Sequence, residues 1–337
     1  MAMASVRGVL VMALLGLMGV RCGGAAEVVG EVPIPELERW EKNMVAYGTM
    51  HRDERAKGID ESAVWYYDGQ RVFYQIADYT KDPKWNEAAR NSEQTYRAYA
   101  FSGNTPGWRV FPHGLYQDFK RTGDEKSKAA VIQLAKSSAF AWAGGGQDPR
   151  LSRETAYILM AYLLAEDLGL PKHPMRDRAA EYALGHIDQW FTSKKAGYVQ
   201  PFMVGLTCEA LIQYYEKTKD RRVPPAIKVA ADWLWGNAWV ARDQAFWYIS
   251  MDPYNPRRKP ERGAPDLNLL IAPAYAWLYL QTGDTRYRDW GDRIFAGGVR
   301  RAWLGDGKQF SQSYRWSFDY VKWRRDAERK RVTGRPR

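Results

Sequence analysis

One short motif recurs between the helical segments of this 337-residue chain, and it constrains the fold more than any other feature. Each copy places a Thr, a Gly or Lys, and an Asp between two apolar-periodic segments: Thr80-Lys81-Asp82, Thr122-Gly123-Asp124, Thr218-Lys219-Asp220 and Thr282-Gly283-Asp284. Gly accepts the left-handed conformation that ends a helix, and Asp caps the first N–H groups of the next helix. The four Asp residues are 42, 96 and 64 residues apart. Helical hairpins at such a period form an open solenoid or a closed ring.

The segments between these joints alternate in character. Segments 201–217 and 266–281 are apolar nearly all round, which indicates helices buried on both sides. The segments that follow them, 223–239 and 285–302, each have one polar face. Further helices are expected near 35–50, 64–79, 83–101, 111–121, 125–142, 151–168, 174–191 and 312–328. About twelve helices in two layers close most naturally as six hairpins around a ring.

The N-terminal segment has the features of a signal peptide. Arg7 supplies a positive charge, residues 9–20 are apolar but too few to cross a bilayer, and residues 24–26 are small, as at a cleavage site. We therefore expect residues 1–26 to be removed on export to the periplasm or beyond. Cys22 leaves a lipoprotein as the alternative, which Arg21 disfavours. We expect a single domain over 27–325 and a basic tail over 326–337.

The net charge of +11 is concentrated at the C-terminus. Residues 322–337 hold eight Lys or Arg against two acidic residues, so the body of the chain is only weakly basic. This distribution does not predict a nucleic-acid partner. We also expect no cofactor, no metal site and no membrane-spanning helix, because no metal-ligand spacing, phosphate-binding loop or second long apolar segment occurs. The expected protein is a monomer, and Cys208 is expected to be a small buried hydrophobe.

The joints, the sequence Trp65-Tyr66-Tyr67-Asp68 and the aromatic residues before the apolar helices carry a family resemblance. Over residues 36–325 the chain resembles the (α/α) toroids of six-hairpin glycosidases and helical polysaccharide lyases. The resemblance implies an all-α, (α/α)6-type toroid with an inner and an outer helix layer. It also implies a carbohydrate substrate, bound on the face where the inner helices begin.

Polar and aromatic residues gather in the segments that precede the inner helices. We expect the catalytic residues among His113, Tyr67, Tyr254, Tyr314, Asp68 and Glu154. We expect the substrate-binding residues among Arg109, Arg153, Trp247, Arg257, Gln312, Arg315 and Trp65. Guanidinium groups suit a carboxylate-bearing substrate because they form two parallel hydrogen bonds to it. Each residue also has a structural interpretation: Asp68 and Asp266 as helix caps, His113 as a buried histidine, the aromatic residues as core.

Three functions are compatible with these residues. A lyase acting on a uronate polysaccharide needs a Tyr or His base and Arg or amide groups that neutralise the uronate carboxylate. A glycoside hydrolase acting on uronyl oligosaccharides needs two carboxyl groups, for which Asp68, Glu154, Asp252 and Asp266 are the candidates. A non-catalytic glycan-binding protein needs neither. The many Tyr and Arg residues, against few uncommitted acids, favour the lyase.

Overall fold

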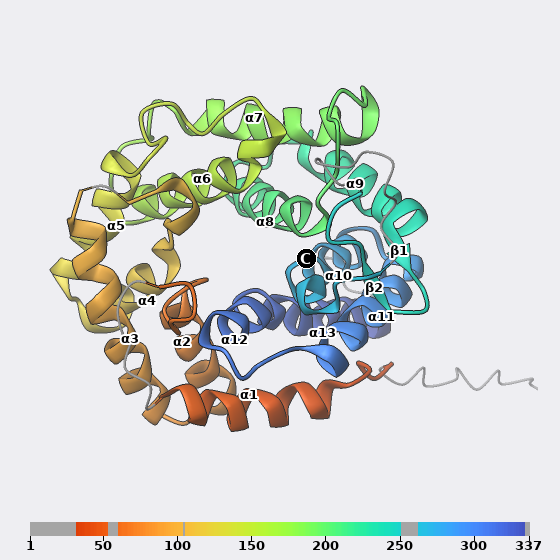
Figure 1. Ribbon diagram of the computed structural model, residues 1–337, viewed down its shortest axis with the longest axis horizontal. Helices are drawn as coiled ribbons and strands as arrows, with labels where there is room; N and C mark the ends of the chain where they lie inside the picture. Colours follow the sequence, from red (N-terminus) through yellow and green to blue (C-terminus); the bar gives the residue numbers. More distant parts are fainter. Residues whose placement is uncertain (1–31, 53–59, 104, 251–261, 334–337) are drawn as a thin grey trace, which may run out of the picture.

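The computed structural model describes residues 32–52, 60–103, 105–250 and 262–333, and these form an α/α toroid. Two concentric layers of helices surround a central axis, as Figure 1 shows. The expected signal segment, including Cys22, lies outside the described residues. In the described part of the chain, no helix is both long and apolar enough to cross a bilayer.

The inner layer contains the most buried helices. It consists of α2 (Gly69–Thr80), α4 (Pro112–Thr122), α6 (Ser152–Asp167), α8 (Pro201–Thr218), α10 (Ala272–Thr282) and the consecutive α12 (Gly307–Tyr314) and α13 (Ser317–Thr333). The outer layer consists of α1 (Leu37–Arg52), α3 (Lys84–Phe101), α5 (Glu125–Ser137), α7 (Arg176–Ile187), α9 (Val223–Ala238) and α11 (Thr285–Arg301). Helices α6, α8 and α10 are buried nearly all round because they touch both the outer layer and the ring interior.

The two ends of the chain complete the sixth hairpin together. Helix α1 packs outside α12, although the two are far apart in the sequence. The indole Nε1 of Trp40 donates to the Ser317 hydroxyl at 3.0 Å, and the hydroxyl of Tyr314 donates to the backbone carbonyl of Trp40 at 2.9 Å. These contacts close the ring without a covalent joint.

The four recurrent joints share one hydrogen-bond network. In each, the Thr hydroxyl donates to the carbonyl four residues earlier at 2.7–2.8 Å. The same hydroxyl accepts from the Asp N–H at 3.1–3.3 Å. The Asp carboxylate then accepts from the N–H two residues later at 2.9–3.1 Å. Each middle residue is left-handed, including Lys81 and Lys219 with φ of 61° and 57°. Three residues therefore end one helix and begin the next.

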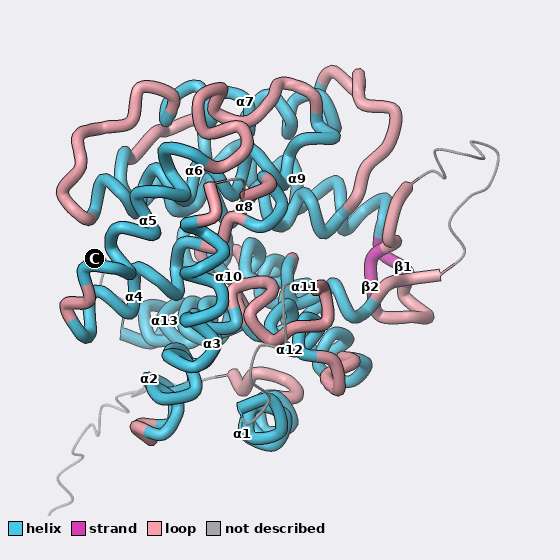
Figure 2. The backbone as a smooth tube through the Cα atoms, turned by 60° about the vertical axis from the view of Figure 1, so that its left-hand side comes forward, coloured by secondary structure: helices cyan, strands magenta, loops and turns pink. Residues whose placement is uncertain are grey.

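We call the side of the ring that holds these joints the joint face, and the opposite side, where the inner helices begin, the start face. Short elements decorate the chain between hairpins: the 3-10 turns η1 (Gly107–Arg109), η2 (Pro149–Leu151) and η4 (Pro265–Leu270), and the π-helical turn η3 (Asp188–Thr192). Among the described residues, the only strands are β1 (Trp239–Val240) and β2 (Ala245–Phe246), an antiparallel pair shown in Figure 2.

Several expected helix boundaries are wrong. Helix α2 begins at Gly69 rather than near 64, because Tyr67 and Asp68 have positive φ values that no helix accommodates. Helix α5 ends at Ser137 rather than 142. The last inner helix begins at Gly307 and is interrupted after Tyr314. Helix α13 also continues to Thr333 and buries Glu328, so it extends beyond position 326, where we expected the tail to begin.

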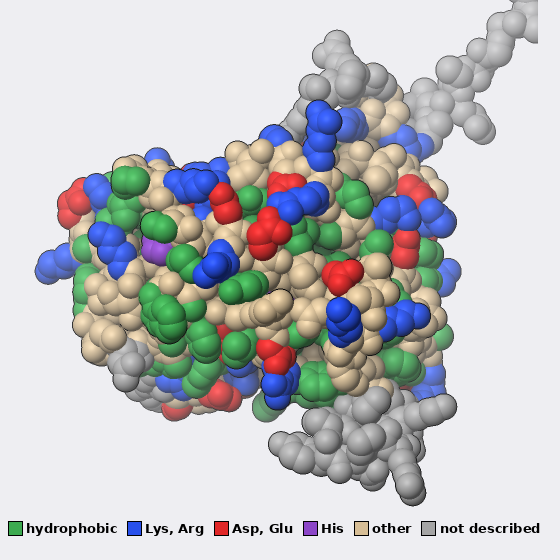
Figure 3. Space-filling view, turned by 90° about the horizontal axis from the view of Figure 1, so that it is seen from above, with side chains coloured by type: hydrophobic (Ala, Val, Ile, Leu, Met, Phe, Trp, Pro, Cys, Tyr) green, Lys and Arg blue, Asp and Glu red, His purple; other side chains and the backbone are tan. Residues whose placement is uncertain are grey.

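The face in Figure 3 carries Lys and Arg side chains interspersed with Asp and Glu side chains. Many of the described surface charges are paired, for example Arg222 with Glu181 and Lys228 with Asp232, both at 2.6 Å. On this face the positive charge is therefore locally balanced, rather than collected into a continuous basic surface.

Candidate functional site

The start of α2 has the most constrained backbone of the start face. Tyr67 and Asp68 are consecutive residues with φ of 57° and 66°, in the left-handed region that residues with a Cβ rarely occupy. Such strain persists only where the surrounding structure holds it, and it is concentrated at functional sites. Because of this turn, Asp68 can cap α2 while Tyr67 precedes it.

Asp68 is a structural cap of two helices. Its carboxylate accepts from the backbone N–H of Arg71 at 3.2 Å, of His113 at 3.1 Å and of Gly114 at 3.1 Å. Burial raises the pKa of Asp68 to about 6, against the lowering effect of Arg71 and Arg315. With its oxygens engaged by the starts of α2 and α4, Asp68 serves the fold and is poorly placed as a free general acid.

A buried charge network lies in the middle of the ring. Glu209 of α8 accepts from Nη1 of Arg71 at 2.6 Å and from Nη2 of Arg315 at 2.8 Å. Nη1 of Arg315 also donates to the hydroxyl of Tyr157 at 3.2 Å. These four side chains are almost wholly withdrawn from solvent, and they join α2, α6, α8 and the α12–α13 junction. The network forms a floor beneath the start face.

Tyr67 lies on the start-face side of this floor. Its ring packs edge-on against Tyr66, with centroids 5.1 Å apart. Burial raises the pKa of Tyr67, while the positive charges of Arg153 and Arg315 lower it. In the described part of the chain these arginines act on the phenol through their charge and not through a hydrogen bond, and the Tyr67 side chain is buried.

Cations and aromatic rings border Tyr67 and Tyr66. The guanidinium of Arg109 lies 4.2 Å from the ring centroid of Trp108, and the ammonium of Lys308 lies 5.5 Å from that of Tyr66. Nη2 of Arg153 donates to Oε1 of Glu154 at 3.0 Å. The second oxygen of Glu154 is buried without a hydrogen-bond partner. An unpaired buried carboxylate oxygen is costly, so a ligand donor there would be stabilising.

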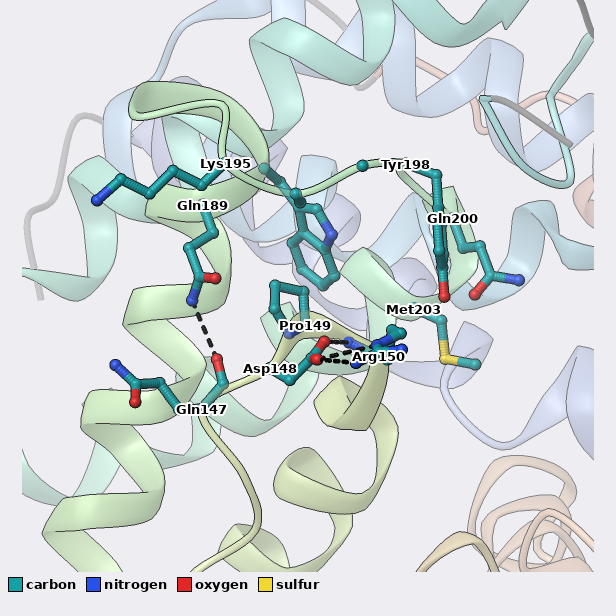
Figure 4. A pocket seen from close by; sticks show the side chains of 12 residues that line it. Gln147, Asp148, Pro149, Arg150, Gln189, Lys195, Tyr198, Gln200 and Met203 are labelled. Atoms are coloured by element: carbon teal, nitrogen blue, oxygen red, sulfur yellow. Dashed lines mark hydrogen bonds and ion pairs between the residues drawn. The ribbon is translucent and has the colours of Figure 1, made fainter. Parts of the chain in front are cut away.

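A cavity of about 610 Å³ lies beside the segment that leads into α6 (Figure 4). It lies between η2, which precedes α6, and the segment from η3 to the start of α8. Arg150, which lines it, is three residues before Arg153 and pairs with Asp148 at 2.5 Å. Gln189 donates to the backbone carbonyl of Gln147 at 3.0 Å. Amides, a phenol and two cations line this cavity: Gln147, Gln189, Gln200, Tyr198, Arg150 and Lys195. Such groups hydrogen-bond sugar hydroxyls and carboxylates.

His113 faces away from this cluster. It lines a separate cavity of about 480 Å³ with Arg71, Glu209 and the C-terminal halves of α6 and α8. One ring nitrogen, Nε2, lies 3.0 Å from Oε1 of Gln213. Burial lowers the pKa of His113 well below its usual range, so its imidazole is neutral. His113 therefore belongs to the interior of the ring on the joint-face side.

Several other expected site residues have structural positions. Tyr314 points outward to α1, where its hydroxyl bonds the Trp40 carbonyl. Trp65 stacks on Tyr96 in the core, with centroids 5.6 Å apart. The side chain of Gln312 is buried and donates to the backbone carbonyl of Asp266 at 2.9 Å. Packing and hydrogen bonding thus account for these three residues.

Trp247 follows β2 and is partly buried against the core, and its backbone bridges Gly263. Arg315 lies in the buried floor, where it pairs with Glu209, and not at the surface. Tyr254, Arg257 and Asp252 lie outside the described residues. The expected residues that the structure gathers on the start face are Tyr67, Arg109, Arg153 and Glu154.

Three residues of the buried network were not among the expected site residues: Glu209, Arg71 and Tyr157. The sequence does indicate a buried ion pair at Glu209, because this acid lies in the middle of an apolar helix segment and such a charge is buried only with a partner.

Among the described residues, one acidic group could hold a metal ion: Glu93, Asp118 and Asp124, with ligand atoms within 4.8 Å of one another. Arg97 already contacts Glu93 and Asp124 at 2.6 Å each.

Comparison with known proteins supports the fold. No protein-family model matches the chain, and no curated protein matches it. Among solved structures, it is similar to the crystal structure of an unsaturated glucuronyl hydrolase specific for heparin. The identity is 13%, the match covers 86% of this chain and 96% of the other, and the TM-score is 0.63. At this identity the similarity shows the shared α/α toroid fold alone.

Proposed function

We propose that this protein is a carbohydrate-active enzyme that binds a uronate-containing glycan on its start face and cleaves it by β-elimination. The observation that carries the proposal is the position of Tyr67, a buried residue with a strained backbone whose phenol lies in the field of Arg153 and Arg315. A phenol beside guanidinium groups is the combination that elimination from a uronate requires.

Arg153 donates to Glu154 through Nε and Nη2, and in this proposal its remaining N–H groups bind the uronate carboxylate. Its charge stabilises the negative charge that develops when the proton on C5 is removed. The Tyr67 phenolate takes that proton. The bond between C4 and the glycosidic oxygen then breaks, a double bond forms between C4 and C5, and the leaving oxygen takes a proton from the Tyr67 phenol. No co-reactant is needed, because Tyr67 gives to the leaving oxygen the proton that it takes from C5. Tyr66 and Trp108 supply flat apolar surfaces against which a sugar ring packs.

Hydrolysis is the second candidate, because Glu154 has a buried oxygen without a partner and the similar solved structure is titled a glucuronyl hydrolase. A hydrolase normally uses two carboxyl groups. Asp68, which directly follows Tyr67, is engaged by three backbone N–H groups. That engagement favours elimination over hydrolysis.

The test is to incubate the purified protein with alginate, glucuronan, pectate and glycosaminoglycans while ultraviolet absorbance and reducing ends are recorded together. Elimination raises both signals in parallel, because each cleavage makes one unsaturated uronate and one reducing end. A rise in reducing ends alone supports hydrolysis and makes Glu154→Gln the next variant. If neither signal rises while a glycan is retained in an affinity assay, the protein binds glycans without cleaving them.

A further inference from the structure

The 480 Å³ cavity on the joint-face side of the ring is separate from the proposed glycan site. Arg71 and Glu209 form its inner end, and the same ion pair is part of the floor beneath the start face. From there the cavity follows the C-terminal halves of the inner helices, past Ile212 and Trp323, to Lys217 near the joints. Its volume is within the range of small-molecule sites, about 300–1,000 Å³.

The walls of this cavity are apolar and aromatic. Leu163, Leu164 and Ile212 line one part, and Trp316 and Trp323 line another. The two indole rings are perpendicular, with centroids 6.3 Å apart, and Trp323 is only partly buried. A compact apolar ligand body would fit such walls, and an indole face attracts a cation through its quadrupole.

The charges of the cavity are unequal. Four carboxylates line it, from Asp167, Glu209, Glu216 and Asp319, against the two cations Arg71 and Lys217. Both cations are already paired, Arg71 with Glu209 and Lys217 with Asp167. Glu209 is also paired with Arg315, which does not line the cavity. An anionic ligand would therefore meet no uncommitted positive charge among the lining residues.

Asp319 is the carboxylate that remains for a ligand. It stands in the first turn of α13, and its one ion pair among the described residues is a long contact of 3.4 Å to Nη2 of Arg71. Its side chain is 31% exposed, so an oxygen reaches the cavity. Burial raises the pKa of Asp319, against the lowering effect of Arg71. A second cation beside this carboxylate would stabilise its charged form.

We propose that the joint-face cavity binds a small organic ammonium ion, held by the carboxylate of Asp319 and by the indole of Trp323. The ammonium group lies between them, and its carbon substituents contact Leu163, Leu164 and Ile212. This site takes a cation, whereas the start face takes a uronate, and the floor of Arg71, Glu209 and Arg315 separates them. The two proposals therefore stand or fail independently.

The test uses choline as the cation and 3,3-dimethylbutan-1-ol as its uncharged carbon analogue, titrated into the full chain by calorimetry. We expect choline to bind at least tenfold more tightly than the alcohol, as a desolvated contact of a cation with a carboxylate and a ring predicts. Equal affinity for both compounds would show an apolar cavity without cation recognition. Absence of binding at millimolar choline would overturn the proposal.

Two variants locate the site. Asp319→Asn keeps the shape and removes the charge, and Trp323→Leu removes the ring; each should weaken choline binding about tenfold. Asp289→Asn is the matched control, because Asp289 pairs with Arg288 at 2.8 Å on the outer helix α11. Thermal unfolding establishes that each variant is folded. If both cavity variants bind choline like the control, the ammonium ion binds elsewhere and the assignment is wrong.

Discussion

Glu209 and Arg315 are joined at the centre of the ring by an ion pair of 2.8 Å, with side chains that are 0% and 2% exposed. The second oxygen of Glu209 binds Arg71 at 2.6 Å. One carboxylate thus pairs with two guanidinium groups from two other parts of the inner layer. A buried charge is tolerated only when it is paired, so this network requires the inner helices to keep their mutual register.

Glu209→Gln should destabilise the fold strongly. The amide keeps the shape but leaves two buried guanidinium groups without their shared anion, which costs about 3–5 kcal/mol in the free energy of unfolding. Urea denaturation measures this loss. Glu181→Gln is the control, since Glu181 pairs with Arg222 on the surface and its loss should cost less than about 1 kcal/mol. Equal effects of the two changes would contradict the structural role of Glu209.

The raised pKa of Asp68 predicts how the free energy of unfolding depends on pH. Because its pKa in the folded protein is about 6, above the unfolded value near 4, the folded state binds the proton more tightly between these values. The contribution of Asp68 is then fully present below about pH 4 and is lost as the pH rises through 6. The difference in unfolding free energy between the wild type and Asp68→Asn should therefore shrink by about 1–3 kcal/mol from pH 4 to pH 7.

Urea denaturation at several pH values measures that difference. If the advantage of the wild type instead grew as the pH rose, the three backbone N–H donors would outweigh burial and hold the pKa of Asp68 below its usual range.

Lys219→Gly should stabilise the protein. Lys219 has φ of 57° at the joint between α8 and α9, where a residue with a Cβ pays about 1–2 kcal/mol that Gly avoids. The greater flexibility of Gly in the unfolded chain offsets part of the gain, so we expect an increase of about 0.5–1 kcal/mol. Lys128→Gly, inside helix α5, should instead lose about 1 kcal/mol. Thermal unfolding of both variants tests the joint geometry, which is supported if the two shifts have opposite signs.

The rate of glycan cleavage should rise with pH. Burial holds the pKa of Tyr67 above that of a free phenol, so only a small fraction of free enzyme carries the phenolate near neutrality. That fraction increases about tenfold for each pH unit below the pKa. The ratio kcat/KM, measured across the range in which the protein stays folded, should therefore increase into the alkaline region. A decrease above neutrality would instead indicate a carboxylic acid such as Glu154 as the proton donor.

The hairpins and the toroid could be predicted from sequence because their signals are local. At the joint of Thr122, Gly123 and Asp124, the Thr122 hydroxyl bonds a carbonyl four residues earlier and the N–H of Asp124. The Asp124 carboxylate bonds an N–H two residues later, so every partner lies within four residues. Asp68 shows the limit of such reasoning. It was expected to cap one helix, but its further donors are the N–H groups of His113 and Gly114, 45 and 46 residues away.

The direction of a side chain also depends on where a helix is interrupted. Tyr314 and Arg315 are neighbours in the sequence, yet Tyr314 bonds α1 on the outside and Arg315 bonds Glu209 at the centre. The turn between α12 and α13 falls at these residues, so a continuous helix over 312–328 gave the wrong register. His113 likewise stands at an inner-helix start, but its side chain lines the cavity on the joint-face side.

The most direct test of the account compares two tyrosines that the sequence presents as equal candidates. Tyr67→Phe and Tyr314→Phe each remove one hydroxyl, and the rate of unsaturated uronate formation is measured for both on the substrate that the wild type cleaves. We predict that Tyr67→Phe lowers kcat by about 10²–10⁴-fold, as loss of a general acid–base group does, while Tyr314→Phe retains the wild-type kcat. Undiminished elimination by folded Tyr67→Phe would contradict the assignment of Tyr67 as the base.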